Sequence, residues 1–146
     1  MYLIDSSVIL PCLWKTTKQA HLHYLAERAE EEAPAISVIT RFEVFAGTTE
    51  EFLETNRLFL DAFQHTEVTS EIADAAGRLF YDWSKKGKRL ESNDLLIGAT
   101  AAVLGLLLIT KNLRHFPYLE EIDRSVVEYA SQKGKQTRET VYILKP

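Results

Sequence analysis

Three acidic residues of the chain stand where metal-dependent chemistry could be assembled. Asp5 follows the short apolar run 2–4, Asp94 precedes a long apolar segment, and Glu43 lies in a stretch with one apolar face. A carboxylate beside buried apolar segments is costly unless something pairs with it, and a hard divalent cation is a natural partner. Mg2+ binds carboxylate oxygens and water and can activate water for phosphodiester cleavage. The three acids together therefore indicate a metal-dependent hydrolytic site.

Each acid also has a purely structural interpretation. Asp5 could cap the following helix together with Ser6. Asp94 could be an acid at a helix start, where the helix macrodipole favours it. Glu43 could be the capping-box partner of Thr40. Because each interpretation competes with metal binding when one acid is considered alone, the metal site depends on the combination.

The elements that would position the acids alternate between strands and helices. Short runs predict strands at 2–4, 35–38, 66–69 and 106–109. Amphipathic or apolar stretches predict helices at 8–13, 18–32, 40–46, 50–63, 70–86 and 94–104. This alternation predicts an α/β fold with a parallel sheet covered on both faces. Such a sheet has its active site outside the carboxyl ends of its strands, which is where Asp5 and Thr110 fall.

The last part of the chain follows a different pattern. A helix is predicted over Ser125–Lys133 and one more strand over Thr140–Leu144. No low-complexity segment or internal repeat occurs in either part. We therefore expect one domain over residues 1–119 and a C-terminal extension, residues 120–146, packed on the same domain.

The composition excludes several classes of protein. The chain has 146 residues, of which 46% are hydrophobic and 26% charged, as expected for one globular domain. Cys12 is the only cysteine, which excludes an internal disulfide and zinc sites built on several thiolates. The longest apolar stretch, 95–109, is shorter than a membrane span, and the first residues lack the basic region of a signal peptide. We therefore expect a cytoplasmic protein with no membrane partner.

Four stretches of the sequence together resemble the PIN-domain ribonucleases, most closely the VapC-type toxins of toxin–antitoxin pairs. In the family's order they are Leu3-Ile4-Asp5-Ser6-Ser7-Val8, Thr40-Arg41-Phe42-Glu43-Val44-Phe45-Ala46-Gly47, Asn93-Asp94-Leu95-Leu96-Ile97-Gly98-Ala99-Thr100-Ala101 and Leu108-Ile109-Thr110-Lys111-Asn112-Leu113-Arg114-His115-Phe116. One stretch alone is a poor indicator, but all four in order over about residues 1–119 are specific. The resemblance implies a three-layer α/β/α domain with a parallel sheet of four to five strands.

The same resemblance implies an activity and a cofactor. The activity is Mg2+- or Mn2+-dependent endonucleolytic cleavage of RNA, commonly tRNA or rRNA. Asp5, Glu43 and Asp94 match the family's acidic metal-site positions. The positions of polar residues that support the site are matched by Ser7, Thr110 and Asn112.

Protein partners are implied by the resemblance as well. They are a small antitoxin protein, which inhibits the toxin, and a second copy of the chain in a homodimer. Apolar residues of two predicted helices could serve either contact, namely Leu22 and Tyr24 on one helix and Phe52 and Leu53 on the other. The sequence does not assign either pair to either partner.

Position 115 departs from the family pattern. Many PIN domains carry a fourth Asp where this sequence has His115. With three acids we expect one well-bound ion and at most one weakly bound ion. His115 itself could contact a phosphate or pack beside Phe116.

Local charge favours an RNA partner more than total charge does. The net charge of −4 argues against binding of nucleic acid by bulk charge. Basic residues nevertheless flank the acids, and the candidate RNA contacts are Lys85, Lys86, Lys88, Arg89, Lys111 and Arg114. Such residues can contact phosphates, although a solvated helix end would also explain the lysines.

Three competing functions fit the sequence less well. A phosphotransferase of the haloacid-dehalogenase type needs a second acid two residues after the first, where this chain has Ser7. A receiver domain needs a phosphoacceptor Asp after a later strand, and none follows the second or third predicted strand. A catalytically degenerate PIN domain that only binds RNA or protein is disfavoured because the three acids are intact. Metal binding would separate this last alternative from a nuclease.

Overall fold

Four short runs form the parallel strands on which the fold is built. The computed structural model describes residues 1–146 and contains β1 (Tyr2–Ile4), β2 (Pro34–Ser37), β3 (Gln64–Thr66) and β4 (Leu107–Thr110). β1 lies between β2 and β4, and all neighbouring pairs among these four strands are parallel. The predicted α/β fold with a parallel sheet is confirmed, but the third strand was predicted over 66–69 and lies over Gln64–Thr66, so the two ranges share only Thr66.

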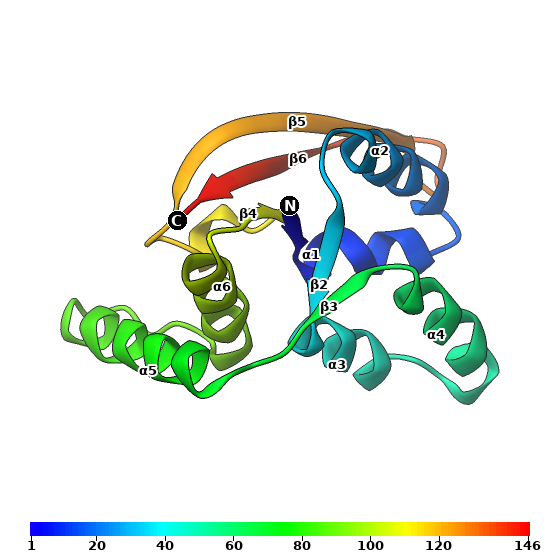
Figure 1. Ribbon diagram of the computed structural model, residues 1–146. Coiled ribbons are helices and arrows are strands. Elements are labelled where there is room, and N and C mark those ends of the chain that lie inside the picture. Colours follow the sequence, from blue (N-terminus) through cyan, green and yellow to red (C-terminus); the bar gives the residue numbers. More distant parts are fainter.

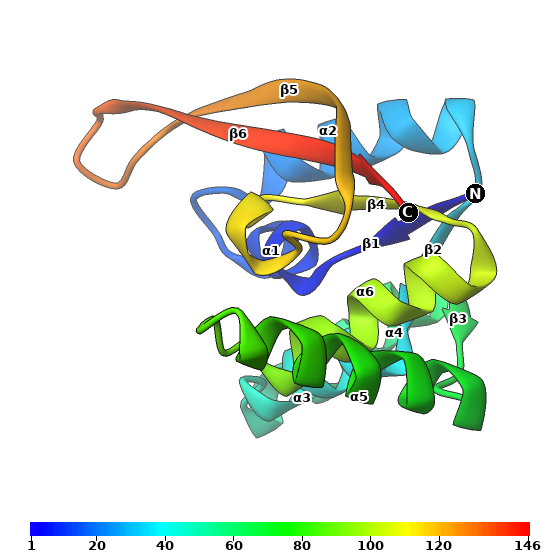
Figure 2. The same ribbon diagram turned by 90° about the vertical axis from the view of Figure 1, so that its left-hand side faces the viewer.

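Helices connect the strands and cover both faces of the sheet (Figures 1 and 2). The α-helices are α1 (Ser6–Ile9), α2 (Lys18–Glu31), α3 (Val38–Ala46), α4 (Leu53–Asp61), α5 (Ser70–Lys85) and α6 (Ser92–Leu104). Short 3-10 helices occur at η1 (Leu10–Leu13), η2 (Glu50–Phe52) and η3 (Leu113–His115). None of the helices combines the length and apolar character that crossing a membrane requires.

The core lies on the two faces of the central strands. Leu3 and Leu108 point to the face that α6 covers and pack near Ile97. Ile4 and Ile109 point to the opposite face, where residues of α1 and α2 pack on them. Because successive strand residues face opposite sides, strands buried on both faces must be apolar throughout. This requirement explains why β1 and β4 are unbroken apolar runs.

The C-terminal part is a long antiparallel hairpin, so the predicted helix over Ser125–Lys133 is wrong. β5 (Glu120–Ala130) pairs with β6 (Gln136–Lys145), and β6 pairs antiparallel with β4. The six strands therefore form one sheet in the order β3-β2-β1-β4-β6-β5. The predicted strand over Thr140–Leu144 is confirmed as part of β6.

The physical reason for the hairpin is a period of two in side-chain burial. Val127 is buried, whereas Val126 and Glu128 on either side of it are exposed. Val127 and Val141 join the same core cluster as Tyr24 of α2. The hairpin therefore lies against α2, as Figures 1 and 2 show, and it extends the sheet beyond β4.

Candidate active site

The three predicted acids come from three different elements and gather at one edge of the sheet. Asp5 directly follows β1, Glu43 is on α3, and Asp94 is in the first turn of α6. A cavity of about 400 Å3 lies there, and none of its lining residues is hydrophobic. The lining consists of Ser6, Glu43, Glu91, Ser92, Asn93, Asp94, Asn112 and His115. Asp5 is almost fully buried, with 1% of its surface exposed.

Asp5 is held through one carboxylate oxygen and left free at the other. Its Oδ2 accepts hydrogen bonds from Ser7 Oγ at 2.6 Å and Thr110 Oγ1 at 2.8 Å. Its Oδ1 is buried and has no hydrogen-bond partner. An unpaired buried carboxylate oxygen is costly, because burial removes its hydration without replacing it. The capping interpretation of Asp5 is wrong, since its side chain makes no capping hydrogen bond to α1.

Backbone groups after β4 fix the two hydroxyls that hold Asp5. The backbone N–H of Lys111 donates to Ser7 Oγ at 2.9 Å, and that of Asn112 donates to Thr110 Oγ1 at 3.0 Å. Each hydroxyl thus accepts from the backbone and keeps its own proton for the carboxylate. Ser7 and Thr110 therefore support Asp5 directly. Asn112 contributes through its backbone, while its side chain lines the cavity.

Glu43 repeats this pattern of one bound and one free oxygen. Asn93 Nδ2 donates to Glu43 Oε1 at 3.2 Å, whereas Glu43 Oε2 is buried without a partner. The predicted capping box is wrong, because α3 begins two residues earlier and Ser37 Oγ accepts from the N–H of Ile39. Thr40 instead donates from Oγ1 to the carbonyl of Ile4. The Glu43 carboxylate therefore does not cap the start of α3.

Asp94 is the one acid of the cavity with a basic neighbour. His115 Nδ1 lies 2.9 Å from Asp94 Oδ2. The pKa of Asp94 is raised to about 6, chiefly by burial and further by the charges of Asp5 and Glu43, while His115 acts in the opposite direction. The predicted packing of His115 beside Phe116 is replaced by this contact with Asp94. Asp94 therefore lines the cavity in addition to lying in the first turn of α6.

A close contact between Tyr118 and α6 fixes the first turn of that helix. The Tyr118 hydroxyl donates to the backbone carbonyl of Asp94 at 3.3 Å. A Cβ atom on Gly98 would collide with the Tyr118 hydroxyl and ring, so only glycine leaves room for the tyrosine. Gly98 is one turn after Asp94. The contact between Gly98 and Tyr118 therefore helps to fix the backbone position from which the Asp94 side chain extends.

The donor set fits a hard divalent cation held partly through water. Two buried carboxylate oxygens, Asp5 Oδ1 and Glu43 Oε2, have no partner, and Glu43 and Asp94 line the cavity. No group of three His, Cys, Asp or Glu side chains is close enough to form a complete ligand set. Mg2+ usually keeps several waters and takes only one or two carboxylates from the protein. The arrangement suits that mode of binding.

The basic residues predicted as RNA contacts fall into two groups. Lys88 Nζ donates to the backbone carbonyl of Arg114 at 3.3 Å, which brings the two basic stretches together beside the cavity. No ion pair within the chain neutralises the group Lys85, Lys86, Lys88, Arg89 and Arg114. Lys111 differs, because its Nζ lies 2.6 Å from Glu139 Oε2 of β6.

Three residues that hold the site were missed by the sequence-based prediction of site residues. Asn93 adjoins Asp94 in the sequence, and this position was the one available signal. Tyr118 and Glu139 act on Asp94 and Lys111 across 24 and 28 residues of sequence. Nothing in their local sequence marks these long-range contacts.

Known proteins resemble this chain over most of its length. A family model described as PIN domain matches residues 2–125. The chain is 36% identical over 123 residues to "Ribonuclease VapC19" of Mycobacterium tuberculosis, covering 84% of this chain and 97% of that relative.

Solved structures show the same fold. A toxin–antitoxin complex from Klebsiella pneumoniae is 26% identical with a TM-score of 0.65, covering 80% of this chain and 90% of that one. VapBC2 from Rickettsia felis, bound to a promoter DNA fragment, is 22% identical with a TM-score of 0.69, covering 80% and 91%. The chain belongs to the PIN domain family.

Proposed function

We propose that this protein is a metal-dependent endoribonuclease that acts as the toxin of a toxin–antitoxin pair. One observation carries the proposal: Asp5 and Glu43 each present a buried oxygen without a partner beside the cavity that Asp94 lines. The similarity to Ribonuclease VapC19, which covers 84% of this chain, supports the reaction class.

Asp5, Glu43 and Asp94 would hold Mg2+ or Mn2+, directly or through water. A bound divalent ion supplies Lewis acidity and lowers the pKa of a bound water for attack on phosphorus. Asp5 Oδ1 is free for this role because Ser7 and Thr110 already occupy Oδ2. Asn93 orients Glu43 in the same way through Oε1. The Asn112 side chain lies in the cavity wall, where it can hydrogen-bond a phosphate oxygen or a water.

The free cations beside the cavity would contact the RNA backbone. Lys88 and Arg114 lie together and carry no ion pair, so their charges remain available to phosphates. His115 faces Asp94 and is half exposed at 48%, close enough to the cavity to meet a phosphate there. Lys111 is a poorer candidate because Glu139 already neutralises it. The RNA class, tRNA or rRNA, remains a prediction from the family resemblance.

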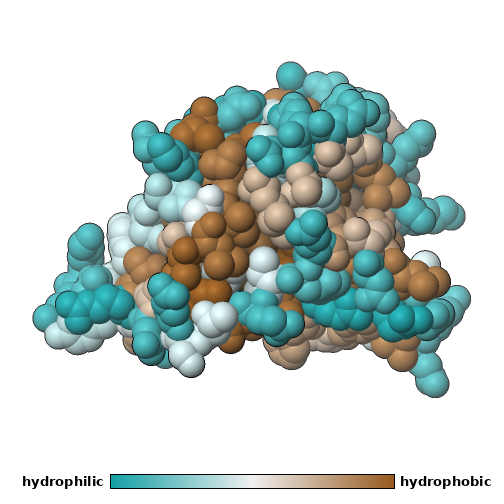
Figure 3. All heavy atoms as spheres, viewed as in Figure 1, coloured by the Kyte–Doolittle hydropathy of each residue, from teal (hydrophilic) through white to brown (hydrophobic).

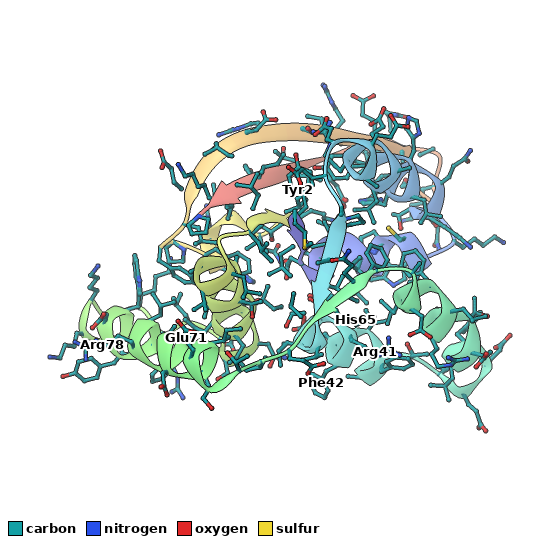
Figure 4. The ribbon with its side chains drawn as sticks, in the orientation of Figure 1. Tyr2, Arg41, Phe42, His65, Glu71 and Arg78 are labelled. Carbon is teal, nitrogen blue, oxygen red and sulfur yellow. The ribbon has the colours of Figure 1, made fainter.

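Exposed apolar side chains on α3 and around η2 provide surfaces for protein partners. Phe42, Phe52 and Leu53 are 59%, 51% and 42% exposed. Figure 4 labels Phe42 on α3, and Figure 3 shows that hydrophobic side chains reach the surface among hydrophilic ones on the face seen in this view. We propose that these surfaces bind an antitoxin or a second copy of the chain. The predicted contact through Tyr24 is wrong, because Tyr24 is buried under the hairpin.

The experiment is a cleavage assay on total bacterial RNA with Mg2+ or Mn2+. Asp5→Asn and Asp94→Asn should lose cleavage by at least about a hundredfold, because each removes a ligand charge. Asp74, on α5, is exposed, and Asp74→Asn is the matched control, which should cleave like the unchanged protein. Full cleavage by Asp5→Asn would contradict the proposal. No cleavage by the unchanged protein, together with no Mg2+ or Mn2+ binding that depends on Asp5 and Asp94, would favour the degenerate alternative.

A further inference from the structure

A second cavity lies beside the acidic one. It measures about 420 Å3 and is lined by Lys111, Asn112, Leu113, Arg114, His115 and Tyr142. Asn112 and His115 line both cavities, so the two spaces are neighbours along one edge of the sheet. An RNA strand that is bound across the acids can therefore continue into the second cavity.

The chemistry of the second cavity is opposite to that of the first. The acidic cavity contains Glu43, Glu91 and Asp94, whereas no carboxylate lines the second one. Arg114 is exposed there and has no acidic partner in the chain. Lys111 is neutralised by Glu139, so Arg114 supplies the fixed charge of this cavity. One cation in such a space suits a single phosphate group.

The rest of the lining suits a flat, partly apolar group. Tyr142 of β6 contributes an aromatic ring and Leu113 of η3 an aliphatic side chain. The guanidinium of Arg124, which does not line this cavity, lies 5.5 Å from the centre of the Tyr142 ring, so a base in the cavity must use the part of the ring that Arg124 leaves uncovered. Nucleobases stack on aromatic rings and on guanidinium planes whatever their sequence.

The position of Tyr142 follows from strand register. Tyr142 pairs with Thr110, the residue whose hydroxyl holds Asp5. Residues directly opposite in a sheet point to the same face. Tyr142 also lies beyond residues 2–125, the part that the family model matches. The C-terminal hairpin therefore adds an aromatic side chain next to the acids.

We propose that this second cavity binds a nucleoside of single-stranded RNA next to the phosphodiester bond that is cleaved. The base packs against Tyr142 and Leu113, and Arg114 contacts its phosphate. The proposal rests on the proposed ribonuclease function and names the substrate as unpaired RNA, because a base inside a duplex cannot reach the ring.

Binding of a fluorescein-labelled single-stranded RNA dodecamer tests the proposal. Fluorescence anisotropy is measured in an Asp5→Asn background with Mg2+, so that the RNA stays intact. Tyr142→Leu should raise the Kd about tenfold, within the range for loss of one base–aromatic stack. Tyr142→Phe keeps the ring and should stay within about twofold. Equal Kd values for Leu and Tyr at position 142 would overturn the proposal.

An abasic dodecamer with the same backbone is the second arm. Tyr142→Leu should leave its binding unchanged, because no base is present to stack. The same loss on both oligomers would show that the ring acts on the fold and would overturn the proposal. This readout does not need cleavage, so it can fail while the unchanged protein still cleaves RNA, and it can succeed if the nuclease assignment fails.

Photo-crosslinking of the unchanged protein decides the matter if Tyr142→Leu does not fold. RNA containing 4-thiouridine should crosslink to the peptides that carry Leu113 or Tyr142. Crosslinks confined to other parts of the chain would overturn the proposal.

Discussion

The acids of the candidate active site and Glu139 of the hairpin are all buried at least in part, but their charges are compensated in opposite ways. Glu139 of β6 accepts from Lys111 Nζ at 2.6 Å and from the Tyr129 hydroxyl at 2.9 Å. The same carboxylate lies 3.1 Å from Nε2 of the buried His21. Asp5 and Glu43, in contrast, each leave one buried oxygen without any partner.

The two regions differ in whether the protein itself neutralises its buried carboxylates. At the hairpin, the Lys111 ammonium neutralises Glu139, and the contacts of Glu139 with Lys111 and His21 join β6 to the residue after β4 and to α2. At the cavity the protein supplies hydroxyl and amide donors but almost no positive charge. Sites that destabilise the isolated fold in this way are typical of functional centres, where a ligand provides the missing interaction.

The largest expected effect on stability is at the hairpin. Glu139→Gln removes the charge that Lys111 and the buried His21 face, and hydrogen bonds to charged groups contribute roughly 1.5–3 kcal/mol. We expect the free energy of unfolding to fall by about 2 kcal/mol. Urea denaturation followed by circular dichroism measures this. If Glu139→Gln is as stable as the unchanged protein, the ion pair of Glu139 does not stabilise the fold, and Glu139 does not differ from Asp5 and Glu43 in this respect.

The second largest effect is expected at the contact of Gly98 with Tyr118, which positions Asp94. Gly98→Ala places a Cβ atom against the Tyr118 hydroxyl and ring, and overpacking costs about 1–3 kcal/mol. Cleavage should fall as well, because Tyr118 fixes the carbonyl of Asp94. The double variant Gly98→Ala with Tyr118→Leu should regain part of the stability, since the clash is removed. Additive losses in the double variant would contradict this account of the contact.

The pH dependence of stability should have opposite signs at the two acids. The pKa of Asp94 is raised to about 6, chiefly by burial, so its stabilising contribution is complete below about pH 4 and is lost as the pH rises through 6. At Glu139 burial raises the pKa, but the hydrogen bonds from Lys111 and Tyr129 outweigh it and leave the pKa below its usual value. That contribution is present at neutral pH and is lost as the pH falls through the lowered pKa.

Thermal unfolding in EDTA between about pH 3 and pH 7 measures both slopes. The Tm of the unchanged protein minus that of Asp94→Asn should decrease as the pH rises from about 4 to about 6. The Tm of the unchanged protein minus that of Glu139→Gln should instead increase with pH below about pH 5 and stay constant above it, because the carboxyl is then ionised in both the folded and the unfolded state. Parallel curves for the two variants would remove the distinction between the acids.

The smallest effect is expected at exposed ion pairs, which calibrate the others. Arg57 pairs with Glu54 at 2.6 Å and with Asp61 at 3.0 Å, but its side chain is 46% exposed. Exposed pairs contribute about 0–1 kcal/mol because water screens them. Arg57→Gln should therefore leave the free energy of unfolding nearly unchanged, which urea denaturation measures. A loss as large as that of Glu139→Gln would show that burial is not what separates the two cases.

The parallel part of the sheet could be predicted because its signals are local. An apolar run closed by Asp5 and another closed by Thr110 mark strands that must be buried on both faces. The carboxyl ends of such strands converge, so the amino-acid sequence alone was enough to place the acids together. The capping of α3 was predicted wrongly, because Thr40 satisfies its hydroxyl by a long-range bond to Ile4.

The hairpin could not be predicted in the same way because its stabilising contacts are distant. Val126 and Val127 are β-branched, and Gly134 has the positive φ of 74° that suits a tight turn. These signals favoured a hairpin, but the charged residues between them also fit an amphipathic helix. The contacts that decide the structure, such as those of Glu139 with Lys111 and His21, join residues that are 28 and 118 positions apart.

Calorimetric titration of Mn2+ into the unchanged protein and into Asp5→Asn tests the central claim most directly. If Asp5 Oδ1 and Glu43 Oε2 bind a cation, the unchanged protein should show saturable heat for about one ion, and Asp5→Asn should show none. Metal-free Asp5→Asn should also be at least as stable as the unchanged protein, because an uncompensated buried charge is gone. Equal Mn2+ heats for the two proteins would contradict the account.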